Sequence, residues 1–142
     1  MILLPTGPRA AIAAHVAADY PNEACGLLLG QKQDGQVLIS QAVASANIAD
    51  QPSHRFEIDP GLRLRLQKAA RAGEAAVIGH YHSHPDGAAR PSDTDRAGIF
   101  EADLVWLIVA VNKGRPREIA AFMPRAEGGG FDELELRENG DR

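Results

Sequence analysis

The sequence predicts an α/β protein in which a curved mixed β-sheet carries helices packed on its faces. Short apolar runs bounded by glycine or turn residues alternate with segments whose apolar residues recur at helical spacing. Strands and helices therefore interleave along the chain, which favours layers of both kinds around one core. The length of 142 residues fits a single domain over 1–142, with a core of about 6–136 and frayed residues at 138–142.

The first predicted element is a helix over Pro8–Asp19. Ile12, Val16 and Tyr20 recur on one of its faces. Proline is favoured in the first turn of a helix, so the helix starts near Pro8. Proline cannot continue a helix, so this one ends before Pro21.

Three short strands follow this helix. Ala24–Gly30 is an apolar strand bounded by glycine, and Val37–Ala44 is predicted as its antiparallel partner. Asp34-Gly35 supplies the turn between them, because this dipeptide suits the tight turn of a hairpin. A further short strand is predicted over His54–Ile58.

The second half of the chain opens with a helix that starts at Asp59-Pro60 and closes at Gly73. An acid at the cap and a proline at the first helical position mark its start, and glycine is common just after a helix. The remaining elements are a strand over Ala75–His84, a helix over Ser92–Ala102, and strands over Leu104–Val111, Ile119–Phe122 and Phe131–Leu136.

Polar residues around the end of the strand over Ala75–His84 carry the strongest functional signal. His82 and His84 are two residues apart, so their side chains share one face of that strand. Asp95 falls in the first turn of the helix that follows Pro91, where it can face the strand end. Two imidazoles and a carboxylate suit a divalent metal, best of all zinc, and leave a fourth position for water, as catalytic zinc sites do.

Each half of this pattern also has a purely structural interpretation. Two polar positions on the exposed face of a strand give the same His-x-His spacing. Ser92-x-x-Asp95 resembles a capping box, in which Ser92 caps the helix and Asp95 reaches back to the Ser92 amide. A short loop makes the two halves converge, however, and capping by Ser92 does not exclude metal binding by Asp95.

This stretch resembles the signature of the JAMM (MPN-plus) metalloproteases. It consists of His82-Ser83-His84-Pro85, the loop up to Pro91, and Ser92-x-x-Asp95. The family also has a glutamate where a helix gives way to an apolar strand, and Glu23 stands in such a segment here. The resemblance extends from about Ala11 to Phe122. It is closest to the small bacterial branch associated with ubiquitin-like sulfur-carrier proteins.

The resemblance implies a deaminase-like fold, one zinc ion per chain and the metal ligands His82, His84 and Asp95. It also implies hydrolysis of an amide bond at or after the C-terminal Gly-Gly of a ubiquitin-like or sulfur-carrier protein. Glu23 is then the candidate base for the water proton and acid for the leaving nitrogen, although outside this context it is an ordinary solvated glutamate. Ser92 is the candidate donor to the oxyanion, if capping leaves its hydroxyl free.

Five neighbouring residues have less defined roles. His80 shares the strand face of the two motif histidines, but we expect it to be packed and hydrogen-bonded. Cys25 is expected to be a small buried residue near the metal rather than a ligand. Ser83 should point to the opposite face in a structural role, and Asn47 lies in a loop that resembles a family segment near the cleft. Trp106 is expected in the core.

Composition narrows the partners and the compartment. The formal net charge is −4 and Lys and Arg form no basic stripe, which argues against nucleic acid. The single cysteine excludes an internal disulfide and suits a reducing cytoplasm. The N-terminus does not have the pattern of a signal peptide, and the longest apolar run, 104–111, is too short to span a bilayer. The oligomeric state, a homodimer included, is left open.

Other functional hypotheses are weaker. A non-catalytic MPN-type scaffold or binding module is the main alternative, but every ligand position is filled here. A deaminase needs a His-x-Glu and a Pro-Cys-x-x-Cys pair, which one cysteine cannot supply. DNA-repair relatives share the His-x-His-Pro-x-Gly spacing, which Asp86-Gly87 satisfies. The segment around Glu23 and the absence of a helix-hairpin domain favour the peptidase branch.

Overall fold

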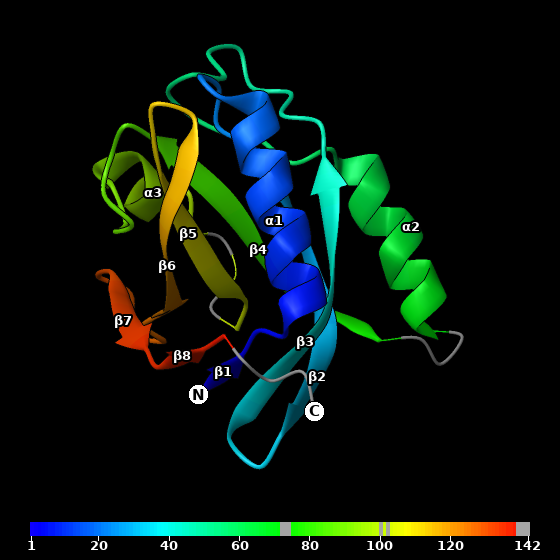
Figure 1. Ribbon diagram of the computed structural model, residues 1–142. Helices are drawn as coiled ribbons and strands as arrows, with labels where there is room; N and C mark the ends of the chain where they lie inside the picture. Colours follow the sequence, from blue (N-terminus) through cyan, green and yellow to red (C-terminus); the bar gives the residue numbers. More distant parts are fainter. Residues whose placement is uncertain (72–74, 100, 102, 139–142) are drawn as a thin grey trace.

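The computed structural model describes residues 1–71, 75–99, 101 and 103–138 (Figure 1). Within this part of the chain, strands form one sheet in the order β7-β6-β5-β4-β2-β3-β1-β8. The strands are β1 Ile2–Leu3, β2 Cys25–Gln33, β3 Gln36–Ser45, β4 Ala76–Pro85, β5 Val105–Asn112, β6 Arg115–Pro124, β7 Phe131–Leu134 and β8 Leu136–Arg137. The helices are α1 Thr6–Asp19, α2 Pro60–Arg71 and α3 Asp93–Ala97. The predicted α/β class is confirmed.

The sheet is mixed and strongly curved. β4 pairs parallel with β5 and antiparallel with β2. β7 and β8 lie at opposite ends of the strand order, yet only Glu135 separates them in the chain. The two edges of the sheet must therefore approach each other, and Figure 1 shows β7 and β8 meeting beside β1. The predicted curvature is confirmed.

Two hairpins join neighbouring antiparallel strands through turns with positive φ. Asp34 (φ 53°) and Gly35 (φ 77°) connect β2 to β3, as the sequence predicts. Lys113 (φ 52°) and Gly114 (φ 83°) connect β5 to β6 in the same way. Positive φ at both central positions matches the right-handed twist of the flanking strands. By contrast, the parallel β4–β5 pair needs a crossover connection, and this connection contains α3.

The alternating side chains of β5 build a core on each face of the sheet. Leu107 and Val109 pack in the cluster that contains Ile12 and Val16 of α1. Trp106, Ile108 and Ala110 point to the other face and pack in a second cluster with Ala120 and Phe122. Burying an aliphatic side chain of this size contributes about 1.5–3 kcal/mol.

None of the described helices is long and apolar enough to cross a membrane.

Both longer helices start close to where the sequence predicts. α1 begins at Thr6, two residues before the predicted start, because the first turn leaves backbone N–H groups free and so accommodates Pro8. Asp59 caps α2, since its Oδ1 accepts a hydrogen bond from the Gly61 N–H at 3.0 Å. The predicted end of this helix at Gly73 lies outside the described residues.

α3 is shorter than predicted. The expected helix over Ser92–Ala102 has the predicted cap at Ser92 but ends at Ala97. The Gly98 N–H donates to the Asp95 carbonyl at 3.0 Å, which closes the helix after little more than one turn. Of the remaining predicted span, residues 100 and 102 lie outside the described residues, whereas Ile99 and Glu101 are not helical.

Three strand predictions also need correction. His54–Ile58 is not a strand, because only Ile58 forms an isolated bridge, to Asn47. The predicted strand Phe131–Leu136 is divided, and its two parts join opposite edges of the sheet as β7 and β8. β1 is too short to show any periodicity in the sequence, and it was not predicted. Its parallel pairing with β3 and β8 is a long-range contact.

Gly26 allows β2 and β4 to pair closely, which gives a test of the central register. A Cβ at this position would overlap the Tyr81 ring and lie 2.5 Å from the Val43 carbonyl oxygen. We therefore expect Gly26→Ala to lower the free energy of unfolding by about 1–3 kcal/mol. Thermal denaturation followed by circular dichroism measures this change.

Gly7→Ala is the matched control, because nothing lies within 4 Å of a Cβ on this helical glycine. It should leave the protein as stable or make it more stable, by up to about 1 kcal/mol, since alanine has the higher helix propensity. Equal melting temperatures for the two variants would contradict the tight packing of Tyr81 against β2.

Candidate active site

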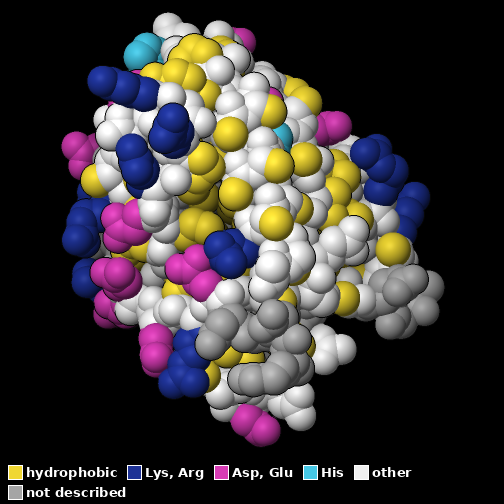
Figure 2. Space-filling model, in the orientation of Figure 1, with side chains coloured by type: hydrophobic (Ala, Val, Ile, Leu, Met, Phe, Trp, Pro, Cys, Tyr) yellow, Lys and Arg dark blue, Asp and Glu magenta, His cyan; other side chains and the backbone are white. Residues whose placement is uncertain are grey.

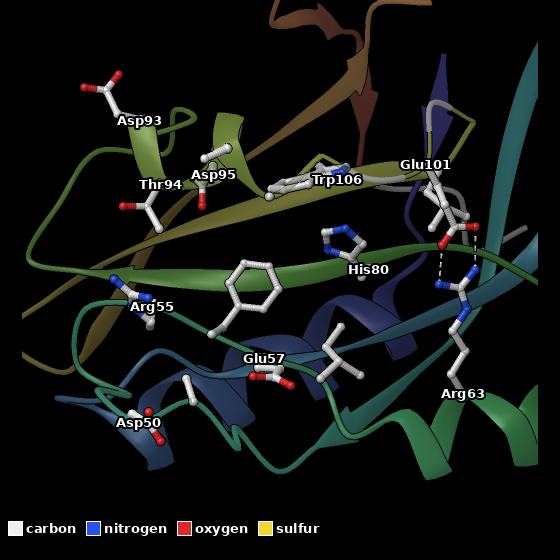
Figure 3. A pocket seen from close by; sticks show the side chains of 16 residues that line it. Asp50, Arg55, Glu57, Arg63, His80, Asp93, Thr94, Asp95, Glu101 and Trp106 are labelled. Atoms are coloured by element: carbon white, nitrogen blue, oxygen red, sulfur yellow. Dashed lines mark hydrogen bonds and ion pairs between the residues drawn. The ribbon is translucent and has the colours of Figure 1, made fainter. Parts of the chain in front are cut away.

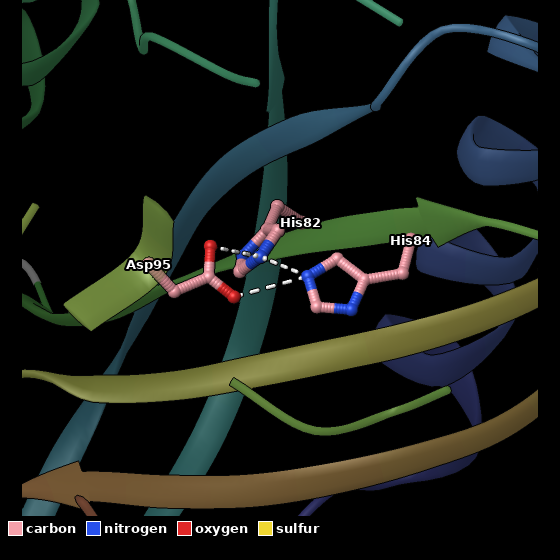
Figure 4. Close-up of side chains that lie close together, drawn as sticks. All are labelled: His82, His84 and Asp95. Carbon is pink, nitrogen blue, oxygen red and sulfur yellow. Dashed lines mark hydrogen bonds and ion pairs between the residues drawn. The ribbon is translucent and has the colours of Figure 1, made fainter. Parts of the chain in front are cut away.

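The end of β4 and the start of α3 bring the three predicted metal ligands together (Figure 4). His82 Nε2 lies 3.1 Å from both His84 Nε2 and Asp95 Oδ1, and His84 Nε2 lies 3.0 Å from Asp95 Oδ2. These three residues form a group, found in the described part of the chain, in which the possible ligand atoms all lie within 4.8 Å of one another. His82 is fully buried and Asp95 is nearly so. The predicted convergence of strand end and helix start is therefore observed.

The hydrogen bonding of His84 suits metal coordination. Its Nδ1 lies 2.8 Å from the Ala88 carbonyl oxygen, an acceptor, so Nδ1 carries the proton of the neutral ring. Nε2 then presents a lone pair towards His82 and Asp95. Such a carbonyl partner on the far nitrogen is common for histidines that bind metals, because it fixes the tautomer and the ring orientation.

The charges of the three side chains also fit a cation. Burial alone would raise the pKa of Asp95, but the hydrogen bonds with His82 and His84 outweigh it and hold that pKa far below its usual range. Burial lowers the pKa of His82, although Asp95 opposes this shift. A carboxylate and two imidazole nitrogens therefore converge on one point, and this donor set matches zinc.

The capping box at α3 orients Asp95. The Ser92 Oγ accepts a hydrogen bond from the Asp95 N–H at 3.0 Å, and Asp95 Oδ2 accepts one from the Ser92 N–H at 2.9 Å. The predicted capping box is confirmed, and Asp95 takes part in it while facing both histidines. Because Ser92 Oγ only accepts in this cap, its own O–H proton stays available, and the side chain is exposed.

The sheet register places Glu23 beside the histidines. Cys25 pairs with His82, and the Ser83 N–H donates to the Ala24 carbonyl at 3.0 Å, so the next pair is Glu23 with His84. Glu23 is only 7% exposed, and its Oε1 has no hydrogen-bond partner among the described residues. Burial raises the pKa of Glu23 to about 7, while His84 lowers it and Asp95 raises it to smaller extents.

Asn47 fixes the backbone around Glu23. Its Nδ2 donates to the carbonyl oxygens of Glu23 and Arg55, both at 2.9 Å. Its Oδ1 accepts from the N–H groups of Ala49 at 3.1 Å and Glu57 at 3.0 Å. The family resemblance places Asn47 in a loop near the cleft. The structure shows that Asn47 ties this loop, 47–57, to the start of β2.

Ser83 and Cys25 behave as the sequence predicts. Ser83 is fully buried, and its Oγ accepts a hydrogen bond from the Ala24 N–H at 2.8 Å, which strengthens the β2–β4 pairing where Glu23 is held. Cys25 is also fully buried and lies outside the group of possible ligands. Burial raises the pKa of its thiol to about 12, so it remains protonated.

A pocket of about 970 Å³ opens beside the candidate metal centre (Figure 3). Asp95 lies at one side of it, and Arg63 of α2 is hydrogen-bonded to Glu101 at another. Trp106 lines the pocket and is 4% exposed, so its predicted core position is confirmed. Phe56 also lines it and stacks on the His82 ring, with centroids 4.2 Å apart and planes at 20°. No sequence motif indicated Phe56, because a lone aromatic residue in a loop carries no periodicity.

His80 is packed as predicted, but the described residues do not provide the predicted hydrogen bond to its Nδ1. Its ring contacts Trp106 edge-on with centroids 4.4 Å apart, and it is 9% exposed. Its Nδ1 is buried without a hydrogen-bond partner among the described residues. Burial, followed by the proximity of His82, lowers the pKa of His80 to about 3, so the ring is neutral.

Comparison with known proteins identifies a family and several relatives. Residues 6–124 match the family described as prokaryotic homologs of the JAB domain. The chain is 34% identical over 92 residues to a desampylase of Haloferax volcanii, covering 65% of each protein. It is 28% identical over 112 residues to a CysO-cysteine peptidase of Mycobacterium tuberculosis, covering 79% of this chain and 75% of the peptidase.

Two further similarities concern extent and fold. Tail tip assembly protein K of Escherichia phage N15 is 32% identical over 117 residues, which cover 82% of this chain but only 43% of the phage protein. A solution structure of a protein from Desulfitobacterium hafniense superposes with a TM-score of 0.85 at 30% identity. That match covers 98% of this chain and 93% of the other.

Replacement of Asp95 by asparagine tests the proposed ligand group. Asparagine preserves the shape and an acceptor for the Ser92 cap, but it removes the negative charge. We expect Asp95→Asn to weaken zinc binding by about 100-fold or more, as measured by competition with a chromophoric chelator. Zinc at about 100 times its Kd should stabilise the unsubstituted protein by about 2.7 kcal/mol and the variant by much less.

Asp93→Asn is the matched control, because Asp93 lies in the same helix but is fully exposed. Its zinc affinity should equal that of the unsubstituted protein. If Asp95→Asn also bound zinc with unchanged affinity, Asp95 would not be a ligand.

Proposed function

This chain belongs to the prokaryotic JAB-domain family, and on that premise we propose that it is a zinc-dependent peptidase or isopeptidase. Its proposed substrate is an amide bond at or after the C-terminal Gly-Gly of a ubiquitin-like or sulfur-carrier protein. One observation carries the proposal. His82, His84 and Asp95 converge beside a buried Glu23 whose carboxylate oxygen has no partner among the described residues. The similarity to the desampylase and the CysO-cysteine peptidase supports the same class of substrate.

The proposed mechanism divides the work between the metal and the chain. When held by His82, His84 and Asp95, zinc would lower the pKa of a water molecule towards neutrality and polarise the scissile carbonyl. Glu23 accepts the proton of the attacking water and passes it to the leaving nitrogen as the C–N bond breaks. A carboxyl group with a pKa near 7 is suited to both directions of this transfer.

Ser92 is proposed to stabilise the negative charge that develops on the carbonyl oxygen. The cap uses a lone pair of its Oγ, and the O–H proton stays free to donate. A donor fixed by a cap needs little reorganisation during the reaction, which is the condition under which such hydrogen bonds are most effective.

A buried Cys25, which remains a thiol, is consistent with the reducing cytoplasm that we propose as the compartment.

Cleavage of a carrier fusion tests the proposed function. The substrate is a ubiquitin-like or sulfur-carrier protein extended by a short peptide after its Gly-Gly, and mass spectrometry identifies the scissile bond. We expect cleavage after the second glycine, abolished by a chelator. Glu23→Ala should lower kcat by a factor on the order of 10²–10⁴ and keep its zinc, because it removes proton transfer but no ligand.

Glu127→Ala is the control for this test, because Glu127 is exposed and lies in the turn between β6 and β7. It should cleave at the unsubstituted rate. Full activity of Glu23→Ala would exclude Glu23 as the base. A zinc-loaded protein that cleaved no such fusion would make the proposed substrate class wrong.

Ser92→Gly separates the two proposed roles of Ser92. Glycine at an N-cap costs only a few tenths of a kcal/mol relative to serine, so α3 should keep its place. The variant has no hydroxyl donor, however, and we expect kcat to fall about 10²–10³-fold with zinc affinity nearly unchanged. Single-turnover kinetics and metal analysis measure the two effects. An unchanged kcat would restrict Ser92 to capping.

A further inference from the structure

The pocket beside the candidate metal centre contains a polar side chain that the proposed mechanism does not use. His80 lines this pocket and lies between Trp106 and the Arg63–Glu101 pair in Figure 3. It is more than nine-tenths buried, and its Nδ1 has no partner among the described residues. The ring forms part of the wall of this pocket, so a ligand that lies against it can hydrogen-bond it.

Packing restricts the orientation of the His80 ring. The Trp106 ring contacts it edge-on, with planes at 61°, and Phe56 lies 5.7 Å away with planes at 45°. The backbone of His80 is held on both sides, by β2 and by β5. An imidazole held in this way is a polar group of fixed orientation in a mostly aromatic part of the pocket.

The spacing along β4 relates His80 to the proposed scissile bond. His80 and His82 are two residues apart on one strand face, which corresponds to about 6.8 Å. An extended substrate also advances by about 3.3 Å per residue. If the scissile carbonyl of the substrate lies at the metal centre, the substrate main chain about two residues away lies over His80. A Gly-Gly tail has no side chains, so only its main-chain amides can bond the ring there.

We propose that His80 hydrogen-bonds a main-chain amide of the substrate's C-terminal tail, about two residues before the scissile bond, and thereby selects an extended Gly-Gly tail. The inference rests on the proposed function, because that function supplies the tail. The tail is the constant part of substrates that differ in their leaving group. An enzyme for such substrates gains most from a large pocket that contacts the constant part.

The test measures binding of the reaction product rather than turnover. Trp106 is the only tryptophan and lines the pocket, so its fluorescence reports occupancy. The probe is the peptide acetyl-Ala-Leu-Ala-Ala-Gly-Gly, titrated into the zinc-loaded protein. We expect His80→Phe, which keeps the aromatic packing, to bind this peptide about tenfold more weakly. His80→Gln, which restores a donor and an acceptor, should stay within about threefold of the unsubstituted protein.

His54→Phe is the matched control, because His54 is exposed and does not line the pocket. It should bind the peptide with unchanged affinity. A second series of peptides replaces one amide N–H at a time by an ester oxygen. One such ester should weaken binding to the unsubstituted protein by about tenfold and have no further effect on His80→Phe, since the two changes remove the same interaction.

The outcomes distinguish this inference from the proposed function. Equal affinities for His80→Phe and the unsubstituted protein, or an ester effect that is the same in both, would overturn the role of His80. So would a peptide that leaves Trp106 fluorescence unchanged. If His80→Phe fails to fold, an ester series that leaves the affinity of the unsubstituted protein unchanged at every position would still overturn the proposed bond. Peptide binding with the predicted ester effect, but without cleavage of any carrier fusion, would reject only the proposed function.

Discussion

The antiparallel pairing of β2 with β4 is the constraint on which the candidate site depends. Its register sets Cys25 opposite His82 and therefore brings Glu23 beside His84. Side chains alternate across a strand, so a slip of one residue would turn both histidines towards α1 and away from α3. Close packing at Gly26 and the hydrogen bonds between Ser83 and Ala24 stabilise this register at the point where the site forms.

Buried polar atoms without a hydrogen-bond partner concentrate where the chemistry is proposed. Among the five buried side-chain atoms without a hydrogen-bond partner in the described part of the chain, one is Arg9 Nε of α1, and the other four are Glu23 Oε1, His80 Nδ1, His82 Nδ1 and Arg63 Nε. All four belong to the ligand group, the proposed base or the lining of the adjacent pocket. Unsatisfied groups of this kind are costly in a folded protein, and they are expected where a metal, water or substrate supplies the missing partner.

Several features of the site follow from patterns that the sequence contains. The alternation of β4 determines that His82 and His84 share a face, and the Ser92 cap determines that Asp95 lies in the first turn of α3. The loop that makes them converge is short, so little else was needed to predict the ligand group. The end of α3 was wrong because the Gly98 backbone closes the helix, and the apolar pattern beyond it gave no sign of this.

The sequence alone determined the identity of the candidate ligands, the α/β class and most strands, because caps, turns and side-chain periodicity act over a few residues. Tertiary structure decided the division of the last predicted strand into β7 and β8 at opposite edges of the sheet, and the stacking of Phe56 on His82. It also decided the anchoring of Glu23 by Asn47 and the unpartnered state of His80. These features depend on contacts between residues far apart in the chain. Such contacts follow from how layers pack and how backbone groups find partners, and no local pattern encodes them.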